Sequence, residues 1–252
     1  MRVATFNILH GLAPGDGRVD AARLAAAVRV LDPDVLALQE VDLDQPRSDH
    51  ADLTRVTAEA MAAVDHRFAA ALHGTPGQTW VAAGESRRPG GPAYGIALLS
   101  RLPVASWRVV RLPRLRVPAP ARVPHRRLPV ISREEPRVGL VAEVSSARGS
   151  VTVAGTHLSF VPWWNARQLR ALLAAVAGSP RPLLLMGDLN MGPEKAEAVS
   201  GLRSLAHHPT FPADAPSRQL DHVLTDAPLR VVSSEALDTG LSDHRALVVE
   251  LA

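Results

Sequence analysis

The chain of 252 residues has no cysteine. This absence excludes disulfide bonds and thiolate metal sites, so any metal would be held by oxygen and imidazole ligands, which favours a hard cation. Long apolar runs are also missing, because no stretch approaches the ~20 residues that a membrane-spanning helix needs. Strand-like residues leading to Asn7 follow Met1 almost at once and leave no room for a secretory leader, so we expect a cytoplasmic protein.

The charges nearly cancel. The chain has 28 Lys plus Arg, nearly all of them Arg, against 25 Asp plus Glu, which gives a formal net charge of +3. A committed duplex-binding protein more often shows a strong basic stripe, because neutralising several phosphates supplies most of its affinity. The charge balance therefore neither requires nor excludes nucleic acid, and no feature indicates an obligate protein partner.

The length and the apolar pattern predict one compact domain over residues 1–252. We expect helices over residues 20–31, 53–64, 163–177 and 193–205, the first with Asp20 as its N-cap. Strands are expected over residues 67–72, 94–100, 107–112, 137–144, 151–157, 220–224, 229–233 and 245–251, with 94–100 and 107–112 forming a hairpin and 137–144 antiparallel to 151–157. Many strands with few interspersed helices favour two stacked mixed sheets covered by outer helices.

Residues 113–129 are rich in proline and arginine. This density excludes a central strand and predicts a long surface excursion. Surface loops on a rigid scaffold usually carry specificity, so this segment is the expected specificity element.

A polar motif ends the apolar run 183–186: residues 187–190 read Gly-Asp-Leu-Asn. By itself the motif is equally typical of a turn after a core strand. Four further polar motifs follow strand-like segments, and they end at Asn7, Glu40, His157 and His244. The five motifs, in this order, resemble the endonuclease/exonuclease/phosphatase superfamily, which includes deoxyribonuclease I-like nucleases, sphingomyelinases and inositol polyphosphate phosphatases. The resemblance implies a four-layered α/β sandwich and hydrolysis of phosphate esters.

By this resemblance, Glu40 of the Gln-Glu-Val motif is the main metal ligand, joined by Asn7 and Asp243. One carboxylate, one carboxamide and several waters form the sparse shell that Mg²⁺ tolerates, so the expected cofactor is Mg²⁺ or Mn²⁺. The resemblance further implies that Asp188 and Asn190 orient the attacking water and the scissile phosphate.

The Ser-Asp-His motif at residues 242–244 resembles the family motif in which the histidine stabilises charge on phosphorus or acts as the general base. Asp221 matches the carboxylate that pairs with it and fixes its tautomer. His157 resembles the phosphate-contacting histidine of the family. Tyr94 and Arg137 are expected at the rim of the phosphate pocket, as substrate-binding residues.

The remaining candidates have bland explanations. We expect Glu134, Glu135, Arg87 and Arg88 to be exposed loop charges and His222 to be structural. The pair Trp163 and Trp164 at a helix start favours a packing anchor over a substrate platform, and His10 is expected at the pocket mouth.

The sequence thus predicts a metal-dependent phosphoesterase that cleaves a mono- or diester by in-line attack of water. Its substrate stays open between a small molecule, a lipid headgroup and a nucleic acid, and a nuclease within the same fold is the alternative. Leu9, two residues after Asn7, replaces the acid typical of abasic-site endonucleases and argues against a repair enzyme. A non-catalytic phosphate-binding scaffold is the remote alternative.

Overall fold

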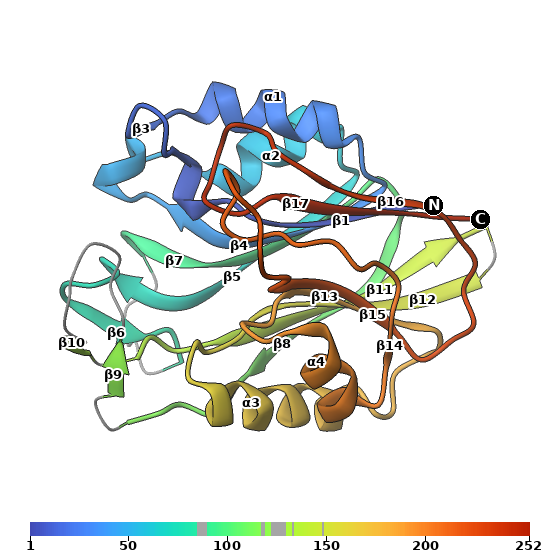
Figure 1. The fold of residues 1–252 in the computed structure, drawn as a ribbon. Coiled ribbons are helices and arrows are strands. Elements are labelled where there is room, and N and C mark those ends of the chain that lie inside the picture. The colour runs from blue at the N-terminus through green and yellow to red at the C-terminus, as the bar shows by residue number, and fades with distance from the viewer. Residues whose placement is uncertain (85–89, 117–118, 122–129, 133, 148) are drawn as a thin grey trace.

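Two β-sheets face each other in the computed structural model, and helices cover their outer surfaces (Figure 1). The structure describes the chain except residues 85–89, 117–118, 122–129, 133 and 148. Helices α1 (Ala21–Leu31) and α2 (Leu53–Met61) lie on one side, and α3 (Pro162–Ala175) and α4 (Pro193–Ser200) lie on the other. The predicted α/β sandwich of two mixed sheets flanked by helices is confirmed.

Within the described residues, the first sheet has the strand order β16-β17-β1-β4-β7-β5-β6. Its strands are β1 (Arg2–Asn7), β4 (Val35–Leu43), β5 (Asp65–Gly74), β6 (Trp80–Ala82), β7 (Ala93–Ser100), β16 (Val231–Leu237) and β17 (Ala246–Leu251). Strand β1 pairs parallel with β4, which brings the carboxyl ends of these two strands to the same edge of the sheet.

The second sheet has the order β14-β15-β13-β12-β11-β8. Its strands are β8 (Val104–Arg111), β11 (Val138–Ser146), β12 (Gly149–His157), β13 (Leu183–Asp188), β14 (Arg203–Ser204) and β15 (Asp221–Thr225). Two short pairs complete the described strands, β2 (Leu12–Ala13) with β3 (Arg18–Val19), and β9 (Ala119–Ala121) with β10 (Val130–Ser132). Strands β11 and β12 are antiparallel neighbours, as predicted.

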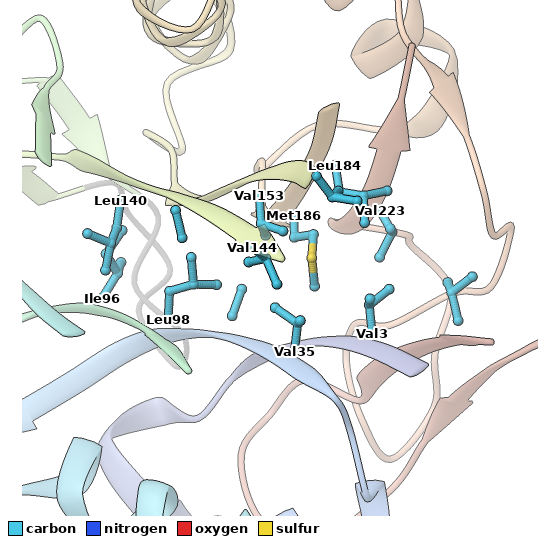
Figure 2. Close-up of a cluster of buried hydrophobic side chains, with 14 of the residues drawn as sticks. Val3, Val35, Ile96, Leu98, Leu140, Val144, Val153, Leu184, Met186 and Val223 are labelled. Atoms are coloured by element: carbon cyan, nitrogen blue, oxygen red, sulfur yellow. The ribbon is translucent and has the colours of Figure 1, made fainter. Parts of the chain in front are cut away.

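The core lies between the sheets, where the inner faces of their strands meet (Figure 2). Val3, Val35 and Leu98 come from the first sheet and pack toward Val153 and Met186 of the second. All five side chains are fully buried. Removing this apolar surface from water is the main stabilising term of the sandwich, and it fixes the two sheets against each other.

The sequence places the helix boundaries well where capping residues mark them. Helix α1 begins after Asp20, whose carboxylate accepts from the backbone N–H of Ala22 at 2.8 Å, as predicted. Helix α2 stops at Met61 instead of residue 64, because Ala62 takes the left-handed conformation. Helix α4 stops at Ser200 instead of residue 205, because Gly201 caps it with φ 68°.

The predicted hairpin of residues 94–100 with 107–112 is wrong. Strand β7 lies between β4 and β5 in the first sheet, whereas β8 is the edge strand of the second and pairs with β11. Residues 101–103 carry the chain from one sheet to the other. Burial gives the reason: every residue of β7 is buried, as a central strand requires, whereas β8 is largely exposed.

Residues 113–129 are only partly described, and residues 117–118 and 122–129 of the expected excursion lie outside the described residues. Strand β9, within this stretch, belongs to a two-stranded pair and to neither large sheet, as the proline density predicts. Among the described residues, no helix is both long and apolar enough to cross a bilayer.

Candidate active site

Polar side chains gather where strands of both sheets end. Asn7 is the last residue of β1, and His157 and Asp188 are the last residues of β12 and β13. His157 and Asp188 are register neighbours in the parallel β12–β13 pair, and Asp221 faces Asp188 across the antiparallel β13–β15 pair. The topology thus brings together residues that are up to 214 positions apart in the chain.

Asp188 is the centre of this cluster. Its Oδ2 accepts from Asn7 Nδ2 at 3.2 Å and lies 3.5 Å from His157 Nε2 and 3.8 Å from His244 Nε2. Its Oδ1 accepts from the backbone N–H of Asn190 at 2.9 Å. Burial raises the pKa of the Asp188 carboxyl to about 7, although the charge of His244 lowers it. This group can therefore take up a proton near neutral pH.

His244 is held by a carboxylate on its other nitrogen. Its Nδ1 lies 2.8 Å from Asp221 Oδ2, and Asp221 is fully buried. Burial lowers the pKa of His244, but the charges of Asp221, Asp188 and Asp243 outweigh it and raise the pKa to about 10. The ring is therefore an imidazolium at neutral pH, with Nε2 turned toward Asp188.

The loop that carries His244 is tied to β1. Ser242 Oγ donates to the carbonyl of Asn7 at 2.6 Å and accepts from the backbone N–H of His244 at 3.1 Å. The ring of Phe211 packs 4.9 Å from the imidazole. These contacts fix the position of His244 relative to Asn7.

Asn190 adopts a left-handed backbone conformation, with φ 51°. Its side-chain Nδ2 donates to the carbonyl of Leu158 at 3.0 Å and lies 3.4 Å from His157 Nε2. Its own carbonyl accepts from Asn165 Nδ2 at 2.9 Å, and Asn165 is fully buried in α3. Helix α3 therefore holds the turn that places the Asn190 amide beside His157.

Glu40 is aimed by an irregularity in β4. The register between β4 and β7 shifts between Leu38 and Val41, and Glu40 has φ 57°, which marks a β-bulge. Its Oε1 accepts from Asn7 Nδ2 at 3.2 Å. Burial raises the pKa of Glu40, and the charge of Asp243 raises it further. Glu40 and Asp188 thus flank the side-chain amide of Asn7.

These donors fit a hard divalent cation. Glu40 is half-buried and Asp188 is buried, and both carboxylates have raised pKa values, so the site favours an added positive charge. The Nδ2 of Asn7 faces both carboxylates and its Oδ1 accepts from the backbone N–H of Leu9 at 3.1 Å, so a metal-bound Asn7 needs its amide turned. Asp243 lies close enough for its charge to act on Glu40.

A second group of possible ligands overlaps the first. Ligand atoms of Asp188, Asp221 and His244 all lie within 4.8 Å of one another. The buried Oδ1 of Asp221 has no hydrogen-bond partner in the described part of the chain. The structure thus has two overlapping groups of possible cation ligands that share Asp188: Asn7, Glu40 and Asp188 in one, and Asp188, Asp221 and His244 in the other.

The cluster opens into a cavity of about 470 Å³. Its lining residues are Asn7, Leu9, His10, Glu40, Arg47, Pro76, Gly77, Tyr94, Glu135, Arg137, His157, Phe160, Asp188, Asn190 and His244. The expected rim residues Tyr94 and Arg137 and the expected mouth residue His10 are among them. Asp221 and Asp243 are not among the lining residues. Asp221 contacts His244 at 2.8 Å, and the charge of Asp243 raises the pKa of Glu40.

Two expectations about charged residues are corrected. Glu134 is buried, with 3% exposed, and Arg137 Nε lies 3.9 Å from its Oε1. The charge of Arg137, partly buried itself, stabilises a carboxylate whose pKa burial raises. Glu135 lines the cavity, and Arg87 and Arg88 lie outside the described residues.

The two tryptophans at the start of α3 differ in burial. Trp164 is buried beside Leu115 and Val161, and its Nε1 donates to the carbonyl of Pro113 at 3.1 Å, as a packing anchor does. Trp163 is 62% exposed. His222 is fully buried, with Nε2 2.8 Å from the carbonyl of Met191.

Sequence reasoning gave no role to Arg47 and Phe160, which line the cavity. Arg47 follows the residues Leu-Asp-Gln-Pro, and the sequence around it has no regular spacing of apolar residues. The nearby acids Asp42 and Asp44 were the only indication that Arg47 forms an ion pair. Phe160 directly follows the His157 motif. An aromatic residue so close to the polar end of a strand could have indicated that Phe160 lies at the site.

Comparisons with known proteins bear on the family and the fold. Residues 4–244 match the sequence model of the Endonuclease/Exonuclease/phosphatase family. An endonuclease/exonuclease/phosphatase from Beutenbergia cavernae is similar at 27% identity and TM-score 0.74, over 100% of this chain and 71% of that chain. A mannosyl-6-phosphatase from Bacteroides thetaiotaomicron shares the fold at 16% identity and TM-score 0.67, over 100% and 99% of the two chains. The human Nocturnin catalytic domain shares it at 19% identity and TM-score 0.62, over 100% and 94%. Among curated protein sequences, none matches.

Proposed function

The chain belongs to the endonuclease/exonuclease/phosphatase family, and from this premise we propose that it is a divalent-metal-dependent phosphoesterase. One observation carries the proposal: a single carboxylate oxygen of Asp188 lies within 3.8 Å of the side chains of Asn7, His157 and His244. A proton acceptor and a fixed imidazolium at one point are what hydrolysis of a phosphate ester by water requires.

Each side chain has a part in the proposed reaction. Asp188 accepts the proton of the attacking water, which its raised pKa permits near neutrality. His244, kept protonated by Asp221, faces the negative charge that builds on the phosphoryl oxygens. The Asn190 amide and His157, whose Nδ2 and Nε2 lie 3.4 Å apart in the cavity wall, contact the phosphate.

Asn7, Glu40 and Asp243 would hold the cation, Mg²⁺ or Mn²⁺. When bound, it supplies a Lewis acid that neutralises charge on the phosphate oxygens. The protein's share is to arrange these oxygen donors, of which Asn7 is 1% exposed and Glu40 and Asp243 are half-buried.

The substrate class is proposed as a mono- or diester, and a nuclease in the same fold is the second candidate. A cavity of about 470 Å³ suits a small ligand, which favours the first. A non-catalytic scaffold is disfavoured, because phosphate binding alone needs no His244 backed by a buried Asp221. One catalytic domain over the whole chain, a cytoplasmic location and a monomeric state stay predictions.

The first test is hydrolysis of bis-p-nitrophenyl phosphate with Mg²⁺ or Mn²⁺. We expect turnover that a chelator abolishes, and a Glu40→Gln variant that needs far more metal, because it loses the anionic ligand. Turnover is followed by p-nitrophenolate absorbance against metal concentration. Wild-type turnover that survives exhaustive chelation would contradict the metal dependence. Once metal-dependent turnover is established, a panel of plasmid DNA, sphingomyelin and inositol phosphates ranks the substrates.

The activity should depend on pH through the protonation of His244. Because the pKa of His244 is raised to about 10, the imidazolium persists through neutrality and activity should fall as the pH rises through about 10. Removal of the charge in Asp221→Asn lowers this pKa, so the alkaline limb of the kcat/KM profile should move to lower pH. An unchanged alkaline limb in Asp221→Asn would contradict the role of the pair.

A further inference from the structure

Arg47 lies in the same cavity but has no part in the reaction proposed above. It belongs to the short 3-10 helix η2 (Pro46–Ser48) that follows β4. Its Nε and Nη2 donate to the carboxylate of Asp42 at 2.8 and 2.7 Å, and its Cζ lies 5.5 Å from the ring centre of Tyr94. A two-point ion pair and an aromatic ring therefore fix the guanidinium before any ligand arrives.

The fold gains little from this pair as such. Asp42 is fully buried, and burial raises its pKa, although Arg47 and Ser48 lower it. Buried ion pairs are often no more stabilising than apolar residues of the same size, because both charges lose their water. What the pair does achieve is a cation with a fixed direction at the cavity wall.

The neighbourhood of Arg47 still has unused hydrogen-bonding groups. Its Nη1 has no hydrogen-bond partner in the described parts of the chain, since both of its bonds there use Nε and Nη2. His10 lines the same cavity, and its Nδ1 has no partner among the described residues, but this atom is buried, so the ring must turn before a ligand can reach it. Burial, together with the charge of Arg47, lowers the pKa of His10 to about 4, so its ring is neutral. A guanidinium N–H in the wall of a cavity that a neutral imidazole also lines suits an oxyanion.

This wall lies beside the phosphoryl centre. The hydrogen bonds of the Arg47 guanidinium go to Asp42 and its ring contact goes to Tyr94, and among the described residues none goes to Asp188. Arg137, not Arg47, is the arginine whose charge acts on His157. The cavity is larger than one phosphoryl group needs, so it has room for the rest of a small substrate.

We propose that Arg47 and His10 form a second anion subsite, so that the preferred substrate is a small phosphate ester whose leaving group carries another negative charge. This inference rests on the function proposed above. The charge is that of a carboxylate or a second phosphate, which share the oxygen acceptors that Arg47 and His10 recognise.

Three esters with the same three-carbon skeleton test the subsite. Glycerol 3-phosphate has an uncharged leaving group, 3-phosphoglycerate adds a carboxylate, and propane-1,3-diol bisphosphate adds a phosphate. Wild-type kcat/KM should be at least about tenfold higher for one or both of the charged esters, as a charge-assisted hydrogen bond provides. Arg47→Gln should remove this preference and change kcat/KM for glycerol 3-phosphate less than about twofold.

Arg47→Gln leaves the buried Asp42 unpaired, so an Arg47→Gln/Asp42→Asn double variant removes both charges and should fold and show the same loss of preference. Arg55→Gln, on the exposed side of α2, is the matched control and should keep the preference. Equal losses for all three esters in the Arg47 variants would mean that Arg47 contacts the scissile phosphate and would overturn the subsite.

The proposed function and the subsite fail in different ways. Wild-type protein that hydrolyses none of the three esters, with metal present, contradicts the function for small monoesters. The subsite is then judged by calorimetry with Asp188→Asn protein: tighter binding of a charged ester, lost with Arg47→Gln, supports it. Equal binding of all three esters by Asp188→Asn overturns it.

Discussion

Asp188→Asn should lower kcat by about 10²–10⁴-fold, the usual contribution of a positioned proton acceptor. The amide keeps the shape of the carboxylate and still accepts from the backbone N–H of Asn190, but it cannot take a proton from water. His244→Ala should cause a loss of similar size, because it removes the charge that faces the phosphoryl oxygens. The measurement is steady-state turnover of a p-nitrophenyl ester at saturating metal.

Stability should not follow activity in Asp188→Asn. Burial raises the pKa of Asp188 to about 7, so above that pH the folded protein holds a charge that burial disfavours. An uncharged amide should therefore leave Tm at pH 8 unchanged or higher, and any gain should shrink as the pH falls below 7. Asp214→Asn, at an exposed position, is the control and should change neither quantity. Wild-type turnover in Asp188→Asn would remove this residue from the reaction.

The sequence predicts the fold largely because its strands carry clear apolar runs and its helices clear caps. Asp20 begins α1, and the apolar runs over residues 151–157 and 183–186 lead to His157 and Asp188, whose strands the structure pairs in parallel. The wrong hairpin of β7 with β8 shows the limit. The local sequence pattern cannot tell whether residues 101–103 form a hairpin turn within one sheet or cross to the other sheet, because only the packing of the two sheets decides this.

The candidate site shows the same division. Motifs at strand ends pointed to Asn7, Glu40, His157, Asp188 and His244, and the structure brings all five to one cavity. The bulge that aims Glu40 leaves no clear mark on the sequence, because a shift of one register position depends on the partner strand.

Charged loop residues were the hardest to place. Glu134 looks like a solvated acid between two charged neighbours, yet it is buried near Arg137. Whether a loop charge faces water or the interior depends on which other segment covers it, and that segment is distant in the chain.

Gly187→Ala should strongly destabilise the folded protein. Gly187 pairs with Thr156 in the β12–β13 ladder and has φ 146°, a conformation that L side chains rarely adopt. A Cβ there would lie 1.9 Å from the Thr156 carbonyl oxygen. Overpacking and backbone strain together should destabilise the fold by about 3–5 kcal/mol, which lowers Tm by roughly 10 °C for a chain of this size.

Thermal unfolding of purified Gly187→Ala against Gly178→Ala measures this effect, because a Cβ at Gly178 meets nothing within 4 Å. A Tm of Gly187→Ala equal to that of the control would contradict the close approach of β12 and β13. Gly187 immediately precedes Asp188, and the same register sets His157 beside Asp188. Any Gly187→Ala protein that still folds must therefore spread the two strands, so its kcat should fall even where Tm is partly recovered by stabilising salts. Gly187, which allows β12 and β13 to approach each other, therefore also keeps Asp188, the proposed proton acceptor, beside His157.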